Sequence, residues 1–180
     1  MLSYEEVVLI KRSYPTMHCS DVDFYKQYET LYDQRPNNIY ELGVGSGEWI
    51  MAMDECLPYD PWWIGVENFA SAYTEVDYYG ELPKTPEELV SQISLSKFIH
   101  YYTPWEPILG DNINPDVCRI DMSMRTQEQY DIITDRCKIL FIDDVFKPDY
   151  TFRLEFALNS KMEILWKGEK EVCLSSGIHP

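Results

Sequence analysis

Three glycines stand on alternate positions of the stretch 43–47, after a short apolar run and before a segment of helical character. Glycine adopts positive φ at little cost and lets a ligand lie close to the backbone. A glycine turn between a strand and a helix forms a ligand site at the carboxyl edge of a sheet, where the first helical N–H groups are free. We therefore predict that Gly43, Gly45, Ser46 and Gly47 contact a small-molecule ligand.

The spacing of these glycines indicates the charge of that ligand. A dinucleotide fingerprint, G-x-G-x-x-G, would place its third glycine at position 48, which is Glu48 in this chain. A carboxylate at that position would face the pyrophosphate that such a turn holds. Glu41, at the end of the preceding apolar run, adds a second negative charge. Carboxylates around a glycine turn favour a ligand with cationic groups over one with phosphates.

Acidic and amide side chains also follow the later apolar runs of the chain. Glu67 and Asn68 end the run 62–66, roughly twenty positions after the turn, where a carboxylate typically accepts hydrogen bonds from ribose hydroxyls. Asp111 and Asn112 follow the run 107–110, and Asp143 and Asp144 end the run 138–142. Because parallel strands end at one edge of a sheet, we expect these side chains to meet at the ligand site.

The segment Glu41-Leu42-Gly43-Val44-Gly45-Ser46-Gly47 resembles the first motif, E/D-x-G-x-G-x-G, of class I S-adenosylmethionine-dependent methyltransferases. The resemblance implies that the glycines approach the amino-acid part of this cofactor and that Glu41 helps to fix its ammonium group. It also implies that Asp111 or Asn112 approaches the adenine amino group. The alternative interpretation, a turn that only connects a strand to a helix, is disfavoured by the second carboxylate at Glu67.

A looser resemblance extends over residues 25–147. Tyr25-x-x-Tyr28, Gly65-Val66-Glu67, Gly110-Asp111 and Ile142-Asp143-Asp144 are similar to segments of macrocin-type sugar O-methyltransferases. In those enzymes the acidic pair binds magnesium, and a glycine and a histidine base follow it. Here Val145, Phe146 and Lys147 follow the pair, so Mg²⁺ is doubtful, and no metal ligand is assigned. Asp143 and Asp144 are the expected catalytic residues, which would orient or deprotonate the acceptor.

The elements that must position these residues follow from hydrophobic periodicity and from Pro and Gly breaks. We predict an α/β fold, a Rossmann-like three-layer sandwich with a mainly parallel sheet, in a single domain over 1–180. Residues 1–36 would form a helical segment on the cofactor side. Only 36 residues follow Asp144, which predicts a shortened C-terminal half that ends in a hairpin instead of a full seven-stranded sheet. The expected helices are 3–13, 23–32, 48–57, 85–101, 126–137 and 149–160; the expected strands are 38–43, 62–67, 107–112, 138–144, 161–166 and 171–175, with 113–125 irregular.

Composition restricts the class of partner. The chain carries 15 basic and 31 acidic residues, for a net charge of −16, which disfavours nucleic acid because binding needs a basic surface. No run of eighteen apolar residues and no signal peptide are found, so neither a membrane span nor secretion is expected. Five scattered cysteines are typical of reduced thiols in a cytoplasmic protein. Homo-oligomerisation is left open.

The sequence thus predicts a protein that binds S-adenosylmethionine and transfers its methyl group to a small-molecule acceptor, at oxygen or at nitrogen. Two alternatives stay open at this point. The chain could cleave the same cofactor, or it could use the fold to bind a partner without catalysis. The identity of the acceptor is not encoded in any motif of the sequence.

Overall fold

A computed structural model describes residues 1–15, 17–67, 88, 91, 93, 95–101, 114–121 and 124–177. Within these residues one sheet has the strand order β3-β2-β1-β4-β5-β7-β6. The strands are Asn38–Leu42 (β1), Trp62–Val66 (β2), Phe98–Tyr101 (β3), Val117–Ile120 (β4), Ile139–Ile142 (β5), Glu163–Lys167 (β6) and Val172–Ser175 (β7). The helices are Tyr4–Arg12 (α1), Asp21–Gln34 (α2), Glu48–Cys56 (α3), Gln127–Thr134 (α7) and Phe152–Asn159 (α8), with a 3₁₀ turn at Pro148–Tyr150 (η2).

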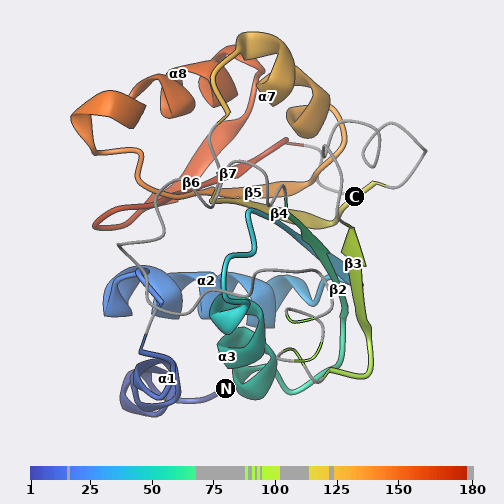
Figure 1. The fold of residues 1–180 in the computed structure, drawn as a ribbon. Coiled ribbons are helices and arrows are strands. Elements are labelled where there is room, and N and C mark those ends of the chain that lie inside the picture. The colour runs from blue at the N-terminus through green and yellow to red at the C-terminus, as the bar shows by residue number, and fades with distance from the viewer. Residues whose placement is uncertain are drawn as a thin grey trace.

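The sheet is mainly parallel and lies between two layers of helices. β1 pairs in parallel with β2 and β4, and the parallel pairing continues to β3 and to β5. β7 is antiparallel to both of its neighbours, β5 and β6. α1, α2 and α3 cover one face, and α7 and α8 cover the other (Figure 1). The predicted fold class, a three-layer α/β sandwich with a C-terminal hairpin, is confirmed.

Each face of the sheet carries its own core because successive strand residues point to opposite faces. Toward α7 and α8 point buried apolar residues, from Tyr40 and Leu42 in β1 to Val172 and Leu174 in β7. Toward α1, α2 and α3 point Ile39, Trp63, Val117, Ile139, Phe141 and Cys173. The central strands are therefore buried on both faces, as a parallel sheet with helices on both sides requires.

Local signals fix where several helices begin. The Ser3 side chain accepts from the Glu6 amide, and the Glu6 carboxylate accepts from the Ser3 amide, which forms a capping box at the start of α1. Thr126 and Gln129 form a second capping box at α7. Ser20 caps α2 through the Asp23 amide. These caps satisfy N–H groups that have no partner inside a helix.

Two strands lie where the sequence did not predict them. β3 occupies residues 98–101, which were expected to end a helix, although residues 88 and 91 are helical. β4 occupies 117–120 within the segment expected to be irregular, and all four of its residues are buried. Both strands form by pairing in the sheet, which overrides local propensity. The predicted strand 107–112 lies outside the described residues.

The C-terminal segment also completes a larger sheet than its length suggested. Seven strands are present within the described ranges, so the expectation that 36 residues are too few was wrong. α8 needs only eight residues, and β6 and β7 are joined by the short turn 168–171. An antiparallel hairpin requires no crossover helix, so few residues are enough to add the last two strands.

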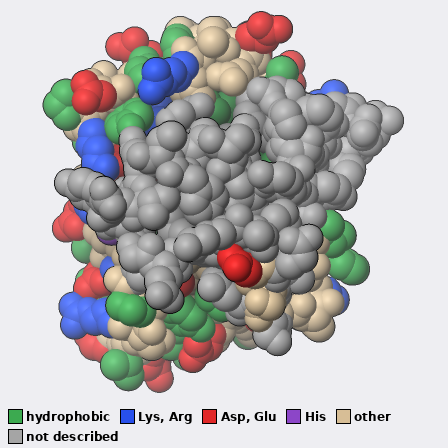
Figure 2. All heavy atoms as spheres, in the orientation of Figure 1, with side chains coloured by type: hydrophobic (Ala, Val, Ile, Leu, Met, Phe, Trp, Pro, Cys, Tyr) green, Lys and Arg blue, Asp and Glu red, His purple; other side chains and the backbone are tan. Residues whose placement is uncertain are grey.

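The surface and the thiols agree with a small, highly charged domain. On the face shown in Figure 2, acidic side chains are spread around the described periphery among hydrophobic and basic ones, without a single acidic patch. All five cysteines are buried, and none forms a disulfide. Among the described helices, none combines the length and the apolar character needed to cross a membrane.

Candidate functional site

The glycine turn after β1 has the conformation that its sequence predicts. Gly43, Gly45 and Gly47 have φ values of 90°, 56° and 77°, a region that favours glycine. The Gly43 amide donates to Val66 O, and the Gly47 amide donates to Val44 O, each at 2.9 Å. Among the described residues, no atom would lie within 4 Å of a Cβ at position 45. The turn is therefore rigidly held, and it presents an open space above Gly45 in which a ligand could lie.

Glu67 belongs to the same turn. Its carboxylate follows β2, is 7% exposed, and accepts a hydrogen bond of 2.9 Å from the Gly45 amide to Oε2. Gly65 brings the neighbouring strand and turn close together: a Cβ there would lie 2.9 Å from a methyl group of Val44. Glu67 thus lies next to the space above Gly45, which is where a ribose-binding carboxylate is expected.

Backbone hydrogen bonds place the other strand ends at this same edge. The Asp121 amide donates to Leu42 O at 2.9 Å, and the Asp143 amide donates to Ile120 O at 3.1 Å. β7 is antiparallel, so its first residues, and Glu171 just before them, also lie at this edge. The carboxyl edge of the sheet therefore gathers acids from β1, β2, β4 and β5 and from the start of β7.

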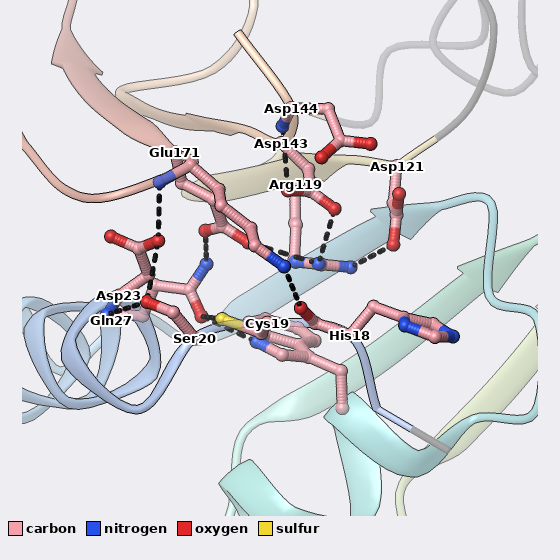
Figure 3. Close-up of polar contacts among 12 residues, drawn as sticks. His18, Cys19, Ser20, Asp23, Gln27, Arg119, Asp121, Asp143, Asp144 and Glu171 are labelled. Carbon is pink, nitrogen blue, oxygen red and sulfur yellow. Dashed lines mark hydrogen bonds and ion pairs between the residues drawn. The ribbon is translucent and has the colours of Figure 1, made fainter. Parts of the chain in front are cut away.

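One arginine, Arg119 in β4, lies in the middle of these acids (Figure 3). Its side chain is 3% exposed. Its guanidinium stacks over the Trp49 ring at 5.1 Å. Its nitrogens lie 2.6 Å from Glu41 Oε1, 3.1 Å from Asp121 Oδ2, 3.3 Å from Glu171 Oε1 and 3.6 Å from Asp143 Oδ2.

One guanidinium faces four carboxyl groups in this arrangement, and the pKa values of three of them are raised. Burial raises the pKa of Glu41 to about 8, against the opposing effect of Arg119. Burial likewise raises the pKa of Glu171 to about 8 and that of Asp143 to about 6; Asp121, which is hydrogen-bonded to Asp143, adds to the latter. Burial alone would lower the pKa of Arg119, but the four carboxylates raise it well above its ordinary value.

One oxygen of this cluster has no protein partner. Glu41 Oε1 is paired with Arg119, but the buried Glu41 Oε2 accepts no hydrogen bond from the described chain. A buried carboxylate oxygen normally has a donor. Glu41 therefore both pairs with Arg119 and has an oxygen left for a hydrogen-bond donor, which a cationic ligand would supply.

The two predicted catalytic acids face different environments. Asp143 Oδ1 accepts from the Asp144 amide at 2.7 Å, while its other oxygen faces Arg119. Asp144 has a φ of 58°, and its carboxylate pairs with Lys147 and points away from Arg119 (Figure 3). The structure therefore groups Asp143 with Asp121 rather than with Asp144.

The C-terminal hairpin and α2 close the cluster from the other side (Figure 3). Glu171 is fully buried and accepts a hydrogen bond from Gln27 of α2. One turn earlier on α2, Asp23 accepts from the amides of Glu169 and Lys170 at 2.7 and 2.8 Å. Helix α2 therefore fixes the turn that carries Glu171, and Glu171 in turn contacts Arg119.

The sequence predicted some residues of this site and did not predict others. Of the predicted residues, the structure places Glu41, Gly43, Gly45, Ser46, Gly47, Glu67, Asp143 and Asp144 at one edge of the sheet, whereas Asn68, Asp111 and Asn112 lie outside the described residues. Arg119, Asp121 and Glu171 were missed. The usable signal was the run Val117–Ile120 followed by an acid, which repeats the pattern of the other strands.

A metal was left doubtful from the sequence. In the parts of the chain that the structure describes, no three His, Cys, Asp or Glu side chains are arranged to hold a metal ion. Asp121, Asp143 and Glu171 are close together, but a guanidinium lies between them. The polar cluster is organised around an arginine.

Comparison with known proteins gives a match at the level of the fold. No family model and no curated protein matches the sequence. An O-methyltransferase of tomaymycin synthesis from Streptomyces achromogenes, in complex with S-adenosylmethionine, has a TM-score of 0.56 and 12% identity over 97% of this chain and 89% of its own. An O-methyltransferase from Bacillus cereus, in complex with S-adenosylhomocysteine, has a TM-score of 0.57 and 11% identity over 96% and 90%. A methyltransferase from Podospora anserina, also bound to S-adenosylhomocysteine, has a TM-score of 0.57 and 14% identity over 96% and 86%. The chain therefore shares the fold of these solved methyltransferases.

Proposed function

We propose that this chain is an S-adenosylmethionine-dependent methyltransferase that acts on a small-molecule acceptor, at oxygen or at nitrogen. The observation that carries the proposal is the glycine turn at Gly45, with Glu67 bonded to its amide and Glu41 Oε2, near the end of β1, without a hydrogen-bond partner among the described residues. The solved structures of the same fold that bind this cofactor or its demethylated product support the choice of ligand.

The residues present suit the charges of this cofactor. When bound, the cofactor would supply an electrophilic methyl group on a cationic sulfur. The turn 43–47 would hold its methionine part, and Glu41 Oε2 would accept from the ammonium group. Glu67 and Asn68 would bind the ribose hydroxyls, and Asp111 or Asn112 would bind the adenine. The net negative charge of the site would favour a cationic ligand.

The acceptor would lie beside Asp143 and Asp121. A general base acts best when its pKa lies near the working pH, and the raised pKa of Asp143, about 6, meets this condition. Asp144 is paired with Lys147, and its carboxylate points away from Arg119. Asp143 would therefore orient or deprotonate the acceptor, with Asp144 in a supporting position. Methyl transfer depends mainly on aligning the two reactants, which a rigid strand end supplies.

Residues 1–36 would form the side of the site that faces the cofactor. In the structure α1 packs on α2 and α3, and α2 contacts the polar cluster through Asp23 and Gln27. We include this segment in the single domain 1–180. A truncated chain that begins at residue 37 would be expected to lose both folding and ligand binding, because Glu171 would lose its partner on α2.

The test is a methyl-transfer assay with a panel of small amines, phenols, sugars and carboxylates, after calorimetry with S-adenosylmethionine and S-adenosylhomocysteine. We expect binding of both, and a methylated product formed together with S-adenosylhomocysteine. Absence of binding at millimolar concentrations would contradict the proposal. Binding without turnover of any acceptor would favour the non-catalytic alternative, and loss of the cofactor without an acceptor would favour cleavage.

A further inference from the structure

The buried arginine has no role in the function proposed above, yet it contacts more of the site than any of the predicted residues. Arg119 lies between Glu41, which is under the glycine turn, and the pair Asp121 and Asp143, which is beside the space assigned to the acceptor. Asp121 is the exposed member of that pair, with 40% of its side chain accessible, whereas the Asp143 side chain is 7% exposed. The guanidinium thus connects the cofactor half of the site to the acceptor half.

We propose that Arg119 is a positioning residue, which holds the carboxylates of Asp121 and Asp143 together at the rim for the acceptor, while Glu171 accepts a hydrogen bond from its second terminal nitrogen. This inference rests on the proposed function for the identity of the site. Its basis is the geometry of one planar group with nitrogens within 3.1 to 3.6 Å of three carboxylates besides Glu41. A guanidinium can bridge several carboxylates because its donors are fixed in one plane, whereas an ammonium group acts as a point charge.

Two structural features keep the guanidinium in place. The Trp49 ring, at 5.1 Å, covers it from α3, and a cation–π contact is favourable in such a desolvated position. Glu171 Oε1 accepts a hydrogen bond from Arg119 Nη2, and Glu171 Oε2 accepts one from Gln27 Nε2. Without a cation at this point, Asp121 and Asp143 would repel each other, and one would take up a proton.

The groups that act on Asp143 come from every element packed around it. They are Arg119 and Asp121 from β4, Glu41 from β1, Glu171 before β7, Cys19 before α2, Asp144 through its amide, and Arg153 of α8, which donates to Asp143 O at 2.9 Å. Arg119 is the cation among them that lowers the pKa of Asp143. Two substitutions should therefore shift the titration of Asp143 in opposite directions.

The first is Arg119→Lys, which keeps the charge but cannot bridge the carboxylates. We expect the midpoint of Asp143, followed by carboxyl carbon NMR in the ligand-free protein, to rise by about one pH unit. The second is Asp121→Asn, which removes the carboxylate that is hydrogen-bonded to Asp143. We expect the midpoint to fall, because the negative charge of Asp121 raises the pKa of Asp143. A residue that only stabilises the fold would not give two shifts of opposite sign.

Arg153→Lys is the matched control. Arg153 is also a buried arginine, stacked over Tyr150 at 4.3 Å, but the bond it makes to Asp143 goes to the backbone carbonyl. Arg153→Lys should reduce stability and leave the Asp143 midpoint within about 0.3 pH units. If an acceptor is found, Arg119→Lys should lower kcat about tenfold at neutral pH and change the KM for the cofactor less than about threefold.

The outcomes separate this inference from the proposed function. Failure of the wild-type protein to bind S-adenosylmethionine would refute the function and leave the titration result standing. Unchanged Asp143 midpoints in both Arg119→Lys and Asp121→Asn would overturn the role of Arg119, whether or not the cofactor binds. Arg119→Met, should it fail to fold, is not needed for either conclusion.

Discussion

Both faces of the sheet are covered by helices, but the residues that they bury differ in polarity. The buried strand residues that point toward α7 and α8 are apolar, from Tyr40 in β1 to Leu174 in β7, and the polar Asn38 and Lys167 lie at the ends of their strands. On the face toward α1–α3, apolar residues occupy the amino ends of the strands, and Glu41, Arg119 and Asp143 occupy the carboxyl ends. Among the described strands the first face buries no charged side chain, and the buried Arg153 of that layer lies on α8. Because burying ions is costly, the charged end of the second face is the part of the molecule best explained by function.

The largest effect should come from removing the cation of the charged end. We expect Arg119→Met to lower the free energy of unfolding by about 3–5 kcal/mol, because it leaves several buried carboxylates without a counter-ion. Cys118→Ala is the control: it is the preceding residue on β4, points to the apolar face, and should cost about 1 kcal/mol. Urea unfolding measures both. A similar small loss for the two variants would remove the distinction between the faces.

The next largest effect should come from breaking the contact between α2 and the hairpin turn. A Cβ at Gly168 would overlap Asp23 Oδ1, whose carboxylate accepts from the amides of Glu169 and Lys170. We expect Gly168→Ala to cost about 1–3 kcal/mol, because the clash displaces Asp23. In a double-mutant cycle the cost of Gly168→Ala should fall when Asp23 is replaced by Ala. Additive losses would show that Asp23 and the turn act independently.

The sequence predicted the apolar architecture better than the charged end. Strands β1, β2, β5, β6 and β7 and the glycine turn were located to within about two residues, because their patterns are local. β4 was missed since Arg119 interrupts its four-residue run. The partners of Arg119 come from three strands and a hairpin turn, and such an arrangement depends on the sheet order, which no local pattern encodes. β3 lies at the sheet edge, and its apolar residues also fitted a helix.

The charged end should also give this protein an unusual pH dependence of stability. The pKa values of Glu41 and Glu171 are raised to about 8 and that of Asp143 to about 6, above their values in the unfolded chain. The native state therefore binds these protons more tightly, and their contribution to stability is lost as the pH rises through 6 to 8. We expect urea unfolding to show lower stability at about pH 8.5 than at about pH 5.5, and Glu171→Gln to reduce the difference. Stability that rises over this interval would contradict the assignment.

The smallest expected difference concerns two helix caps on opposite faces. Thr126→Ala removes the cap of α7 and should cost about 1 kcal/mol. Ser20→Ala removes the cap of α2 and also the hydrogen bond from Ser20 Oγ to Asp23 Oδ2, of 2.9 Å, so it should cost somewhat more. Thermal unfolding of the pair measures this difference. Equal losses would indicate that Asp23 does not depend on Ser20.

The central claim is that the glycine turn after β1 binds S-adenosylmethionine, and a pair of matched glycines tests it most directly. Gly45 and Gly177 have φ values of 56° and 66°, and a Cβ at either would meet no atom of the described residues within 4 Å. Replacement by alanine should therefore cost similar stability at each, about 1 kcal/mol. Calorimetric titration with S-adenosylhomocysteine should show affinity reduced at least about tenfold in Gly45→Ala and unchanged in Gly177→Ala. Equal affinities in the two variants, or no binding to the wild-type protein, would contradict the account.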